Sequence, residues 1–335
     1  MKAAIVGIAG PVLTATEAKL FRAAPPAGVI LFARNIIDPV QLAMLVADLR
    51  RILPADAVLM VDQEGGRVAR LRPPFWQSHP AAGVIGTAFL KSPAAGLRAA
   101  WLTGFLIGQQ CAVAGFDVIC APVLDVRDPG SHDVVGDRAF GTDAQAVARL
   151  GRAAAQGLLA AGIQPVMKHA PGHGRARVDS HTELPRVEAN DLQRDFYPFS
   201  ANMDLPWAMT AHILYTGLDP ALPATLSGPV IGKVIRGTMG FDGVLVSDDL
   251  AMGALSGITG GGTPETRALA ALAAGCDVAL FCPGGEDANA AVLHAVPEAS
   301  SRSLTRLRRA RILAASRRIS LDPGRLAAER DRSLA

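Results

Sequence analysis

The segment KHAPGHGRARVDSH, residues 168–181, concentrates side chains that can do chemistry. Its histidines, aspartate, basic residues and glycines are compatible with a metal site, a phosphate-binding loop, a nucleic-acid contact or the acid–base groups of a hydrolase. Asp179 and His181 are two residues apart, so on an extended segment both side chains point to the same side. An aspartate beside an imidazole orients the ring and stabilises its protonated form. A turn closed by a local hydrogen bond of the aspartate is the structural alternative.

The segment VLVSDDLAM, residues 244–252, places two carboxylates directly after an apolar run. A carboxylate held on a rigid strand can attack the anomeric carbon of a sugar and form a covalent glycosyl-enzyme. Asp248 and Asp249 are the candidates for this role. The same reaction needs a proton donor for the leaving oxygen, and Asp179 with His181 can supply it.

Short apolar runs recur along the chain, each followed by a loop and a helix-like segment. Each run is too short for a helix and too uniformly apolar for a one-sided strand, so each predicts a parallel strand buried on both faces. The runs cover residues 3–8, 28–32, 57–62, 116–125, 164–169, 207–212, 243–249 and 277–281. Candidate helices lie between the runs, for example over residues 39–52, 94–114, 144–161, 228–239, 264–274 and 304–318.

This alternation predicts an α/β protein with a single closed (β/α)8 barrel of the TIM type. A doubly wound open sheet is the alternative, but no GxGxxG motif follows the first strand. We expect one catalytic barrel domain over residues 1–335, with a basic C-terminal helix at about residues 302–319.

Polar residues stand at the carboxyl ends of the predicted strands, where the active site of such a barrel lies. They are Arg34, Asn35, Asp62, Asp125, Lys168, His169, His212, Asp248 and Asp249. Charged groups beside buried runs are costly unless they are paired or functional. Structural ion pairs at the barrel mouth are one explanation, and a polar pocket is the favoured one. Its mixture of carboxylates and cations suits hydrolysis or another group transfer on a polar substrate.

A zinc site is a rival interpretation, with His169, His173, His181, His212 and Asp248 as possible ligands. The chain has no HExxH motif, and its histidines fall in different structural contexts, so we predict no metal. A metal-dependent barrel hydrolase and a non-hydrolytic sugar-binding barrel remain as alternatives.

Composition restricts the partners. The net charge of +3 is too small to imply a polyanion, so we expect no nucleic-acid partner, and the arginines near residues 302–319 predict a solvated helix face. Four scattered cysteines without CxxC spacing predict free thiols in a reducing compartment. No apolar stretch is long enough to span a bilayer. We therefore expect a cytoplasmic monomer without a membrane partner that binds a small-molecule substrate.

The motifs resemble those of glycoside hydrolase family 3, in its β-N-acetylhexosaminidase branch. KHAPGHGRARVDSHTELP is similar to the KHFPGHG…DSH…LP signature of that branch. GVILFARN, VDQEGGRVARL, APVLDV, GDRAFG, HILYTGLDPALPATLS and GFDGVLVSDDLAM also resemble its motifs, in the same order over about residues 28–281. The length resembles that of the single-domain bacterial cytoplasmic enzymes of peptidoglycan recycling.

The resemblance implies a retaining exo-hydrolase that removes terminal β-linked GlcNAc from peptidoglycan fragments, without a cofactor. The implied substrates are GlcNAc-1,6-anhydro-MurNAc and its peptide-bearing forms, and the implied intermediate is a covalent glycosyl-aspartate. Asp248 would be the nucleophile, His181 the general acid/base and Asp179 its partner. The sugar-binding residues would be Asp62, Arg70, Arg138, Lys168 and His169. One departure is Ala170, where the family usually has Phe, and we expect it to alter packing beside the site.

Overall fold

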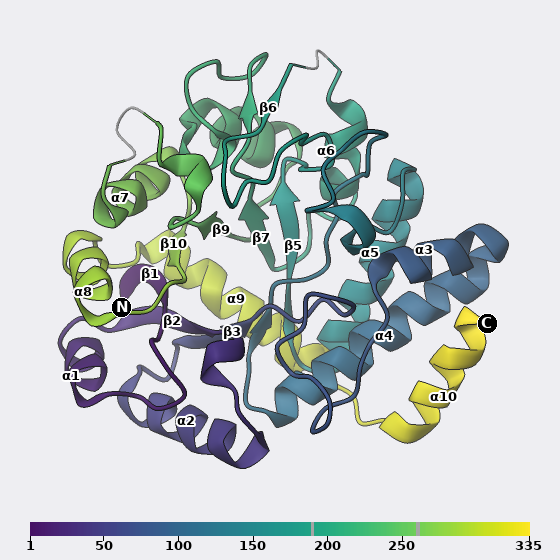
Figure 1. Cartoon of the computed structure of the whole chain (residues 1–335), viewed down its shortest axis with the longest axis horizontal. Coiled ribbons are helices and arrows are strands. Elements are labelled where there is room, and N and C mark those ends of the chain that lie inside the picture. Colours follow the sequence, from purple (N-terminus) through teal and green to yellow (C-terminus); the bar gives the residue numbers. More distant parts are fainter. Residues whose placement is uncertain (189–190, 259–261) are drawn as a thin grey trace.

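The computed structural model of the chain describes residues 1–188, 191–258 and 262–335. Eight parallel strands close into a barrel at the centre of the molecule, in the order β1-β10-β9-β7-β5-β4-β3-β2, with helices outside them (Figure 1). The strands are β1 Lys2–Gly7, β2 Pro26–Leu31, β3 Val58–Val61, β4 Val118–Ile119, β5 Gln164–Ala170, β7 Trp207–Thr210, β9 Val244–Asp249 and β10 Val278–Phe281. Each overlaps one predicted run, so the predicted (β/α)8 barrel is confirmed.

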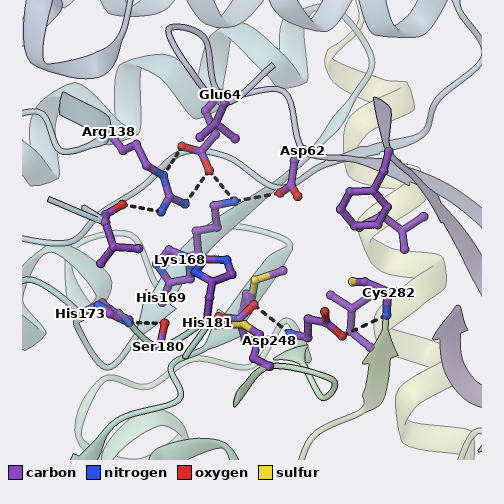
Figure 2. Close-up of a pocket in the computed structure, with 18 of the residues that line it drawn as sticks. Asp62, Glu64, Arg138, Lys168, His169, His173, Ser180, His181, Asp248 and Cys282 are labelled. Atoms are coloured by element: carbon purple, nitrogen blue, oxygen red, sulfur yellow. Dashed lines mark hydrogen bonds and ion pairs between the residues drawn. The ribbon is translucent and has the colours of Figure 1, made fainter. Parts of the chain in front are cut away.

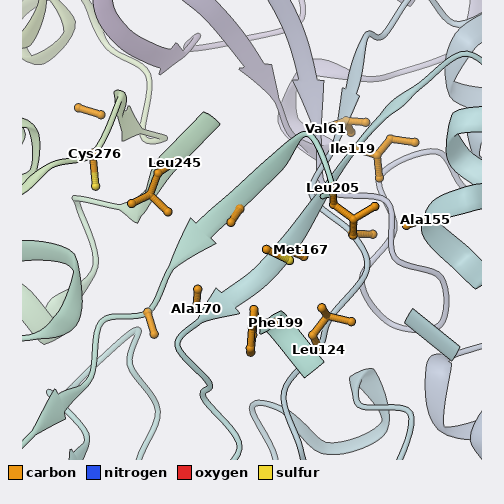
Figure 3. Close-up of a cluster of buried hydrophobic side chains, with 14 of the residues drawn as sticks. Val61, Ile119, Leu124, Ala155, Met167, Ala170, Phe199, Leu205, Leu245 and Cys276 are labelled. Atoms are coloured by element: carbon orange, nitrogen blue, oxygen red, sulfur yellow. The ribbon is translucent and has the colours of Figure 1, made fainter. Parts of the chain in front are cut away.

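The strands are apolar throughout because each buries both of its faces. In β3, Val58 and Met60 belong to the cluster that fills the barrel, whereas Leu59 and Val61 pack outward against the helices. In β9, Leu245 likewise points outward. Figure 3 shows the outer layer, in which strand residues such as Val61 and Leu245 share one cluster with side chains from other elements.

The helices are α1 Ala15–Ala23, α2 Pro39–Ile52, α3 Ala82–Lys91, α4 Pro93–Val113, α5 Ala144–Ala160, α6 Gln193–Ser200, the π-helix Val230–Thr238, α7 Pro264–Ala274, α8 Glu286–Ala295, α9 Ser301–Arg317 and α10 Pro323–Leu334. The predicted bounds of α2 and α7 agree with the structure to the residue. Local signals explain this agreement. The side chain of Asp38 accepts hydrogen bonds from the amides of Val40 and Gln41, and Gly275 follows α7 with a left-handed φ of 119°.

Several features of the fold were not predicted, and they include helices α3, α6 and α8. A two-stranded parallel sheet joins β6, Arg186–Val187, to β8, Leu214–Tyr215. Helix α10 packs along α4 on the outside of the barrel (Figure 1). Helix α9 lies at the amino-terminal end of the barrel, where Leu307 and Ala310 join the inner cluster.

The basic face of α9 is only partly solvated. Arg302, Arg308 and Arg309 are exposed, but Arg306 is buried and pairs with Asp277 at 2.9 Å. Part of the positive charge of this helix is therefore neutralised by a buried ion pair and does not face solvent.

The four cysteines are buried free thiols, as their scatter predicted. Within the described residues, no helix is long and apolar enough to cross a membrane.

Candidate active site

A pocket of about 320 Å³ opens at the carboxyl ends of the barrel strands (Figure 2). Its floor includes Ile30, Met209 and Leu280, whose side chains belong to the barrel interior. The predicted site residues that line it are Asp62, Arg70, Arg138, Lys168, His169, His181 and Asp248. Asp179 lies behind His181 and does not line the pocket. The fold thus brings together residues from three strand ends, those of β3, β5 and β9, and from three loops.

A buried ion network forms one wall of the pocket. Lys168 Nζ lies 3.0 Å from Asp62 Oδ1 and 2.7 Å from Glu64 Oε1. Arg138 makes a bidentate pair with Glu64, with Nε–Oε2 and Nη2–Oε1 distances of 2.8 Å. Arg70 Nη2 lies 3.2 Å from Asp62 Oδ2. We call Asp62, Glu64, Arg70, Arg138 and Lys168 the buried ion network.

These groups hold one another in their charged forms. Burial alone would raise the pKa of Glu64, but Lys168 and Arg138 outweigh it and lower that pKa to about 2. The pKa of Asp62 is lowered in the same way, against burial, by Lys168 and Arg70. Burial would lower the pKa of Lys168, but the two carboxylates raise it. The wall therefore presents fixed charges, which suit hydrogen bonds to the hydroxyl groups of a sugar.

Glu64 is the main functional candidate that the sequence reasoning missed. It lies two residues after Asp62, on the loop of residues 63–71 that follows β3. Gln63 fixes this loop, since its Oε1 accepts hydrogen bonds from the amides of Arg70 at 2.6 Å and Leu71 at 3.1 Å. The spacing of Asp62 and Glu64 was the available signal, because residues i and i+2 of an extended segment share a side.

A second buried carboxylate orients two histidines. Asp125 is fully buried, and its Oδ1 accepts hydrogen bonds from the amides of His169 and His173, at 3.1 and 2.7 Å. Its Oδ2 lies 2.7 Å from His169 Nδ1. Burial would raise the pKa of Asp125, but His169 outweighs it and lowers that pKa to about 2. The ionised carboxylate therefore fixes a proton on Nδ1 and the orientation of the ring.

The loop after β5 carries the predicted acid–base pair. His181 Nδ1 and the His181 amide lie 2.7 and 2.9 Å from Asp179 Oδ1, so the local turn and the orienting contact coexist. The loop is held from two sides. His173 Nε2 lies 3.2 Å from Ser180 Oγ, and the amide of Gly253 donates to the carbonyl oxygen of His181 at 3.0 Å.

Packing requires a glycine at position 174. A Cβ atom there would lie 1.8 Å from the carbonyl oxygen of Val126. Ala170, the departure from the family signature, is buried in the outer hydrophobic cluster of Figure 3 and does not line the pocket. The presence of Ala in place of the family's usual Phe therefore affects packing beneath the loop.

Asp248 and Asp249 occupy the end of β9 and both line the pocket. Burial alone would raise the pKa of Asp248, but His212, His169 and the Asp249 amide at 2.8 Å outweigh it and lower the pKa. Asp249 Oδ1 accepts hydrogen bonds from the amides of Ala251 and Cys282, each at 3.0 Å, and burial raises its pKa. Asp248 is therefore the better candidate for an ionised nucleophile, whereas Asp249 holds the amides of two loop residues.

Two of the polar strand-end residues support the site from behind. His212 is buried between Thr225 Oγ1, at 2.8 Å, and the carbonyl oxygen of Asp249, at 2.9 Å. Asn35 Nδ2 donates to the carbonyl oxygens of Ile8 and Gly10. Arg34, by contrast, lines the pocket and donates to the carbonyl oxygen of Cys282.

The described residues contain no group of three or more His, Cys, Asp or Glu side chains that could hold a metal ion. The histidines at positions 169, 173, 181 and 212 instead contact Asp125, Ser180, Asp179 and Thr225.

Comparisons with known proteins agree with this geometry. The model of the glycosyl hydrolase family 3 N-terminal domain matches residues 11–320. A β-hexosaminidase from Alkalilimnicola ehrlichii is 40% identical over 299 residues, which are 87% of this chain and 83% of that protein. A solved structure of NagZ from Neisseria gonorrhoeae in complex with zinc ion has a TM-score of 0.82 and 28% identity, and the match covers 99% of this chain and 96% of that one.

The same Neisseria protein has been solved in complex with N-trifluoroacetyl-D-glucosamine, with a TM-score of 0.77, 28% identity and coverage of 94% of this chain and 98% of that one. The match to the family model spans the barrel strands from β2 to β10 and all the residues of the pocket. The chain therefore belongs to glycosyl hydrolase family 3, whose members hydrolyse O-glycosyl bonds.

Proposed function

We propose that this glycoside hydrolase is a retaining exo-β-N-acetylglucosaminidase that works through a covalent glycosyl-aspartate. One observation carries the proposal: Asp248, a carboxylate with a lowered pKa, lines the same pocket as His181. A nucleophile and an acid–base group from different elements can then act on one glycosidic bond. The relatives named β-hexosaminidase and NagZ support this choice among glycosidases.

In the first step, the Asp248 carboxylate attacks the anomeric carbon of the terminal GlcNAc. The bond to the leaving oxygen breaks, and protonated His181 gives its Nε2 proton to that oxygen. Asp179, 2.7 Å from Nδ1, stabilises the imidazolium before the transfer and keeps Nδ1 protonated after it. The products are the aglycone alcohol and a glycosyl-Asp248 ester.

In the second step, a water molecule attacks the same carbon. Neutral His181 accepts a proton from this water, the ester bond to Asp248 breaks, and the carboxylate is regenerated. Two displacements at one carbon return the β configuration, and protons balance over the cycle. No metal or cofactor takes part in either step.

The buried ion network and His169 would bind the sugar. Arg70 lines the pocket and its side chain is 22% exposed, so its guanidinium can donate to a substrate oxygen. Bidentate arginines and a fixed lysine suit the hydroxyl groups and the acetamide carbonyl of GlcNAc. Binding of N-trifluoroacetyl-D-glucosamine by the Neisseria relative supports an N-acylated sugar at this position.

We propose peptidoglycan fragments, GlcNAc-1,6-anhydro-MurNAc with or without peptide, as the substrates. The support is the likeness to NagZ and the motif resemblance, which also favour action in the cytoplasm as a monomeric single-domain enzyme. The approach to the pocket is open enough for His181 to remain largely exposed, which suits an aglycone that extends outward.

The test is mass spectrometry of the protein after incubation with a 5-fluoro GlcNAc-type inhibitor. We expect a covalent adduct on the peptide that contains Asp248, and Asp248→Ala to lose nearly all hydrolysis of an aryl β-GlcNAc. The variant Asp249→Asn should still form the adduct on Asp248. Sugar binding without turnover would instead support a non-hydrolytic barrel, and loss of turnover after chelation would support the metal-dependent alternative.

A further inference from the structure

The C-terminal helix α10 carries a buried arginine. Arg330 is 4% exposed, although its helix lies on the outside of the barrel against α4 (Figure 1). Its Nε and Nη2 pair with Asp331 Oδ1, at 2.9 and 2.7 Å. Its Nη1 is 3.1 Å from His79 Nδ1. Helix α10 starts three residues after the end of the family-model match at residue 320, so the proposed catalytic machinery does not account for this contact.

His79 accepts this contact in its neutral form. Burial lowers the pKa of His79 to about 4, so the ring carries one proton at neutral pH. Arg330 can only donate, so His79 Nδ1 is the acceptor and Nε2 carries the proton. Nε2 then donates to Gln110 Oε1 of α4 at 3.3 Å. The imidazole thus joins α10 to α4 with each nitrogen in a defined role.

The backbone beside His79 supports the loop of residues 63–71. The carbonyl oxygen of His79 accepts a hydrogen bond from the amide of Gly66 at 2.9 Å. The contact between the two segments is close. A Cβ on Gly65 would lie 2.4 Å from the carbonyl oxygen of Pro80, and one on Gly66 would lie 2.7 Å from Ala81 Cβ. Gly65 and Gly66 also have positive φ values of 98° and 55°.

This loop carries both Glu64 and Arg70 into the pocket. Gln63 and Val68 tie the loop internally, since the amides of Glu64 and Gly65 both donate to the carbonyl oxygen of Val68. The loop is therefore tied together by its own hydrogen bonds, and the hydrogen bond from Gly66 to His79 fixes it to the segment of residues 79–81. Displacement of the loop would shift Glu64 relative to Lys168 and Arg138.

We propose that Arg330 and His79 are positioning residues, through which α10 holds the loop of residues 63–71 in register with the sugar-binding pocket. The inference rests on the proposed function only for its effect on catalysis. The structural part, that Arg330 restrains this loop, is independent of what the pocket binds.

The first measurement is hydrogen–deuterium exchange of the full-length protein. In Arg330→Met, amides of residues 63–71 should exchange about three- to tenfold faster. Loss of the hydrogen bond between Arg330 and His79 should raise the equilibrium constant for local opening of the loop by about that factor. Glu329→Gln is the matched control. It removes the ion pair of the same helix with Arg98, 2.7 Å in length, and does not touch His79, so exchange in the loop should stay at the wild-type rate.

The second measurement is steady-state kinetics with an aryl β-GlcNAc. Arg330→Met should raise KM about three- to tenfold with a smaller change in kcat, since it disturbs groups that bind the sugar. Arg330→Lys, which can still donate to His79, should recover most of the loss. His79→Leu removes the same link from the other side and serves if Arg330→Met does not fold.

Unchanged exchange in the loop, in folded Arg330→Met and His79→Leu, overturns the inference. So does a drop in thermal stability with wild-type KM, because that pattern describes a helix that only stabilises the fold. A wild-type protein that hydrolyses no β-GlcNAc refutes the proposed function, and the exchange experiment still decides whether Arg330 positions the loop.

Discussion

The Glu64–Lys168 ion pair and the Asp179–His181 contact have the same separation, 2.7 Å, but the first is buried and the second is largely exposed. The side chains of the first pair are 6% and 3% exposed, and they come from a strand end and a loop that Gln63 braces. The side chains of the second are 32% and 62% exposed, and they lie on a loop held by a few hydrogen bonds.

The difference matches the two tasks that we propose for these pairs. Binding a sugar requires charges that keep one geometry and lose little strength to solvent, and burial with several partners provides this. Donating and accepting a proton requires contact with solvent and with the leaving group, and an exposed imidazole oriented by one carboxylate provides that. We therefore expect substitutions in the first pair to alter stability and binding together, and those in the second to alter only chemistry.

The largest effect on stability is expected for Lys168→Met. Removal of Lys168 takes away the cation that the two buried carboxylates share, and costs about 3 kcal/mol in the free energy of unfolding. The value is at the low end of the usual range because Asp62 keeps Arg70 and Glu64 keeps Arg138. Urea unfolding measures this cost, and KM for an aryl β-GlcNAc should rise in parallel. Lys233→Met, on the surface, is the control. Wild-type stability in Lys168→Met would show that the buried network does not support the fold.

His181→Ala should leave the unfolding transition unchanged and lower kcat by about 10²–10⁴-fold for substrates with a poor leaving group. The loss should be smaller for activated aryl leaving groups, which need less protonation. Thermal unfolding and a leaving-group series measure the two quantities, with His294→Ala as a control for removal of an exposed histidine. An equal loss for every leaving group would remove His181 from the acid role.

A smaller and pH-dependent effect is expected for Glu64→Gln. The pKa of Glu64 is lowered from 4.5 to about 2, so the ionised carboxylate stabilises the folded state above pH 4.5, and this contribution is lost as the pH falls toward 2. The Tm difference between wild type and Glu64→Gln should be largest at neutral pH and shrink below pH 4.5. A difference independent of pH would mean that packing, and not charge, explains the role of Glu64.

Local patterns were sufficient for the barrel strands and for several of the helices. A strand buried on both faces is a continuous apolar run, so each of the eight barrel strands was visible in the sequence. Capping residues fixed the bounds of α2, where Asp38 and Pro39 begin the helix. Helix α10 was missed because only Leu326 and Arg330 are buried in it, which leaves too weak an apolar stripe.

The candidate site, too, was predictable from the sequence only in part. Because polar residues after buried runs must meet at one end of a closed barrel, the sequence by itself determined that Asp62, Lys168, His169 and Asp248 share a pocket. Which side chains pair there was decided by tertiary structure. Lys168 meets Asp62 from 106 residues away, and Asp125 accepts from two histidines at once. Such pairings depend on barrel closure and on the paths of the loops, which bring distant side chains within hydrogen-bond reach. Because these contacts are not local, they produce no periodic pattern in the sequence that could have predicted them.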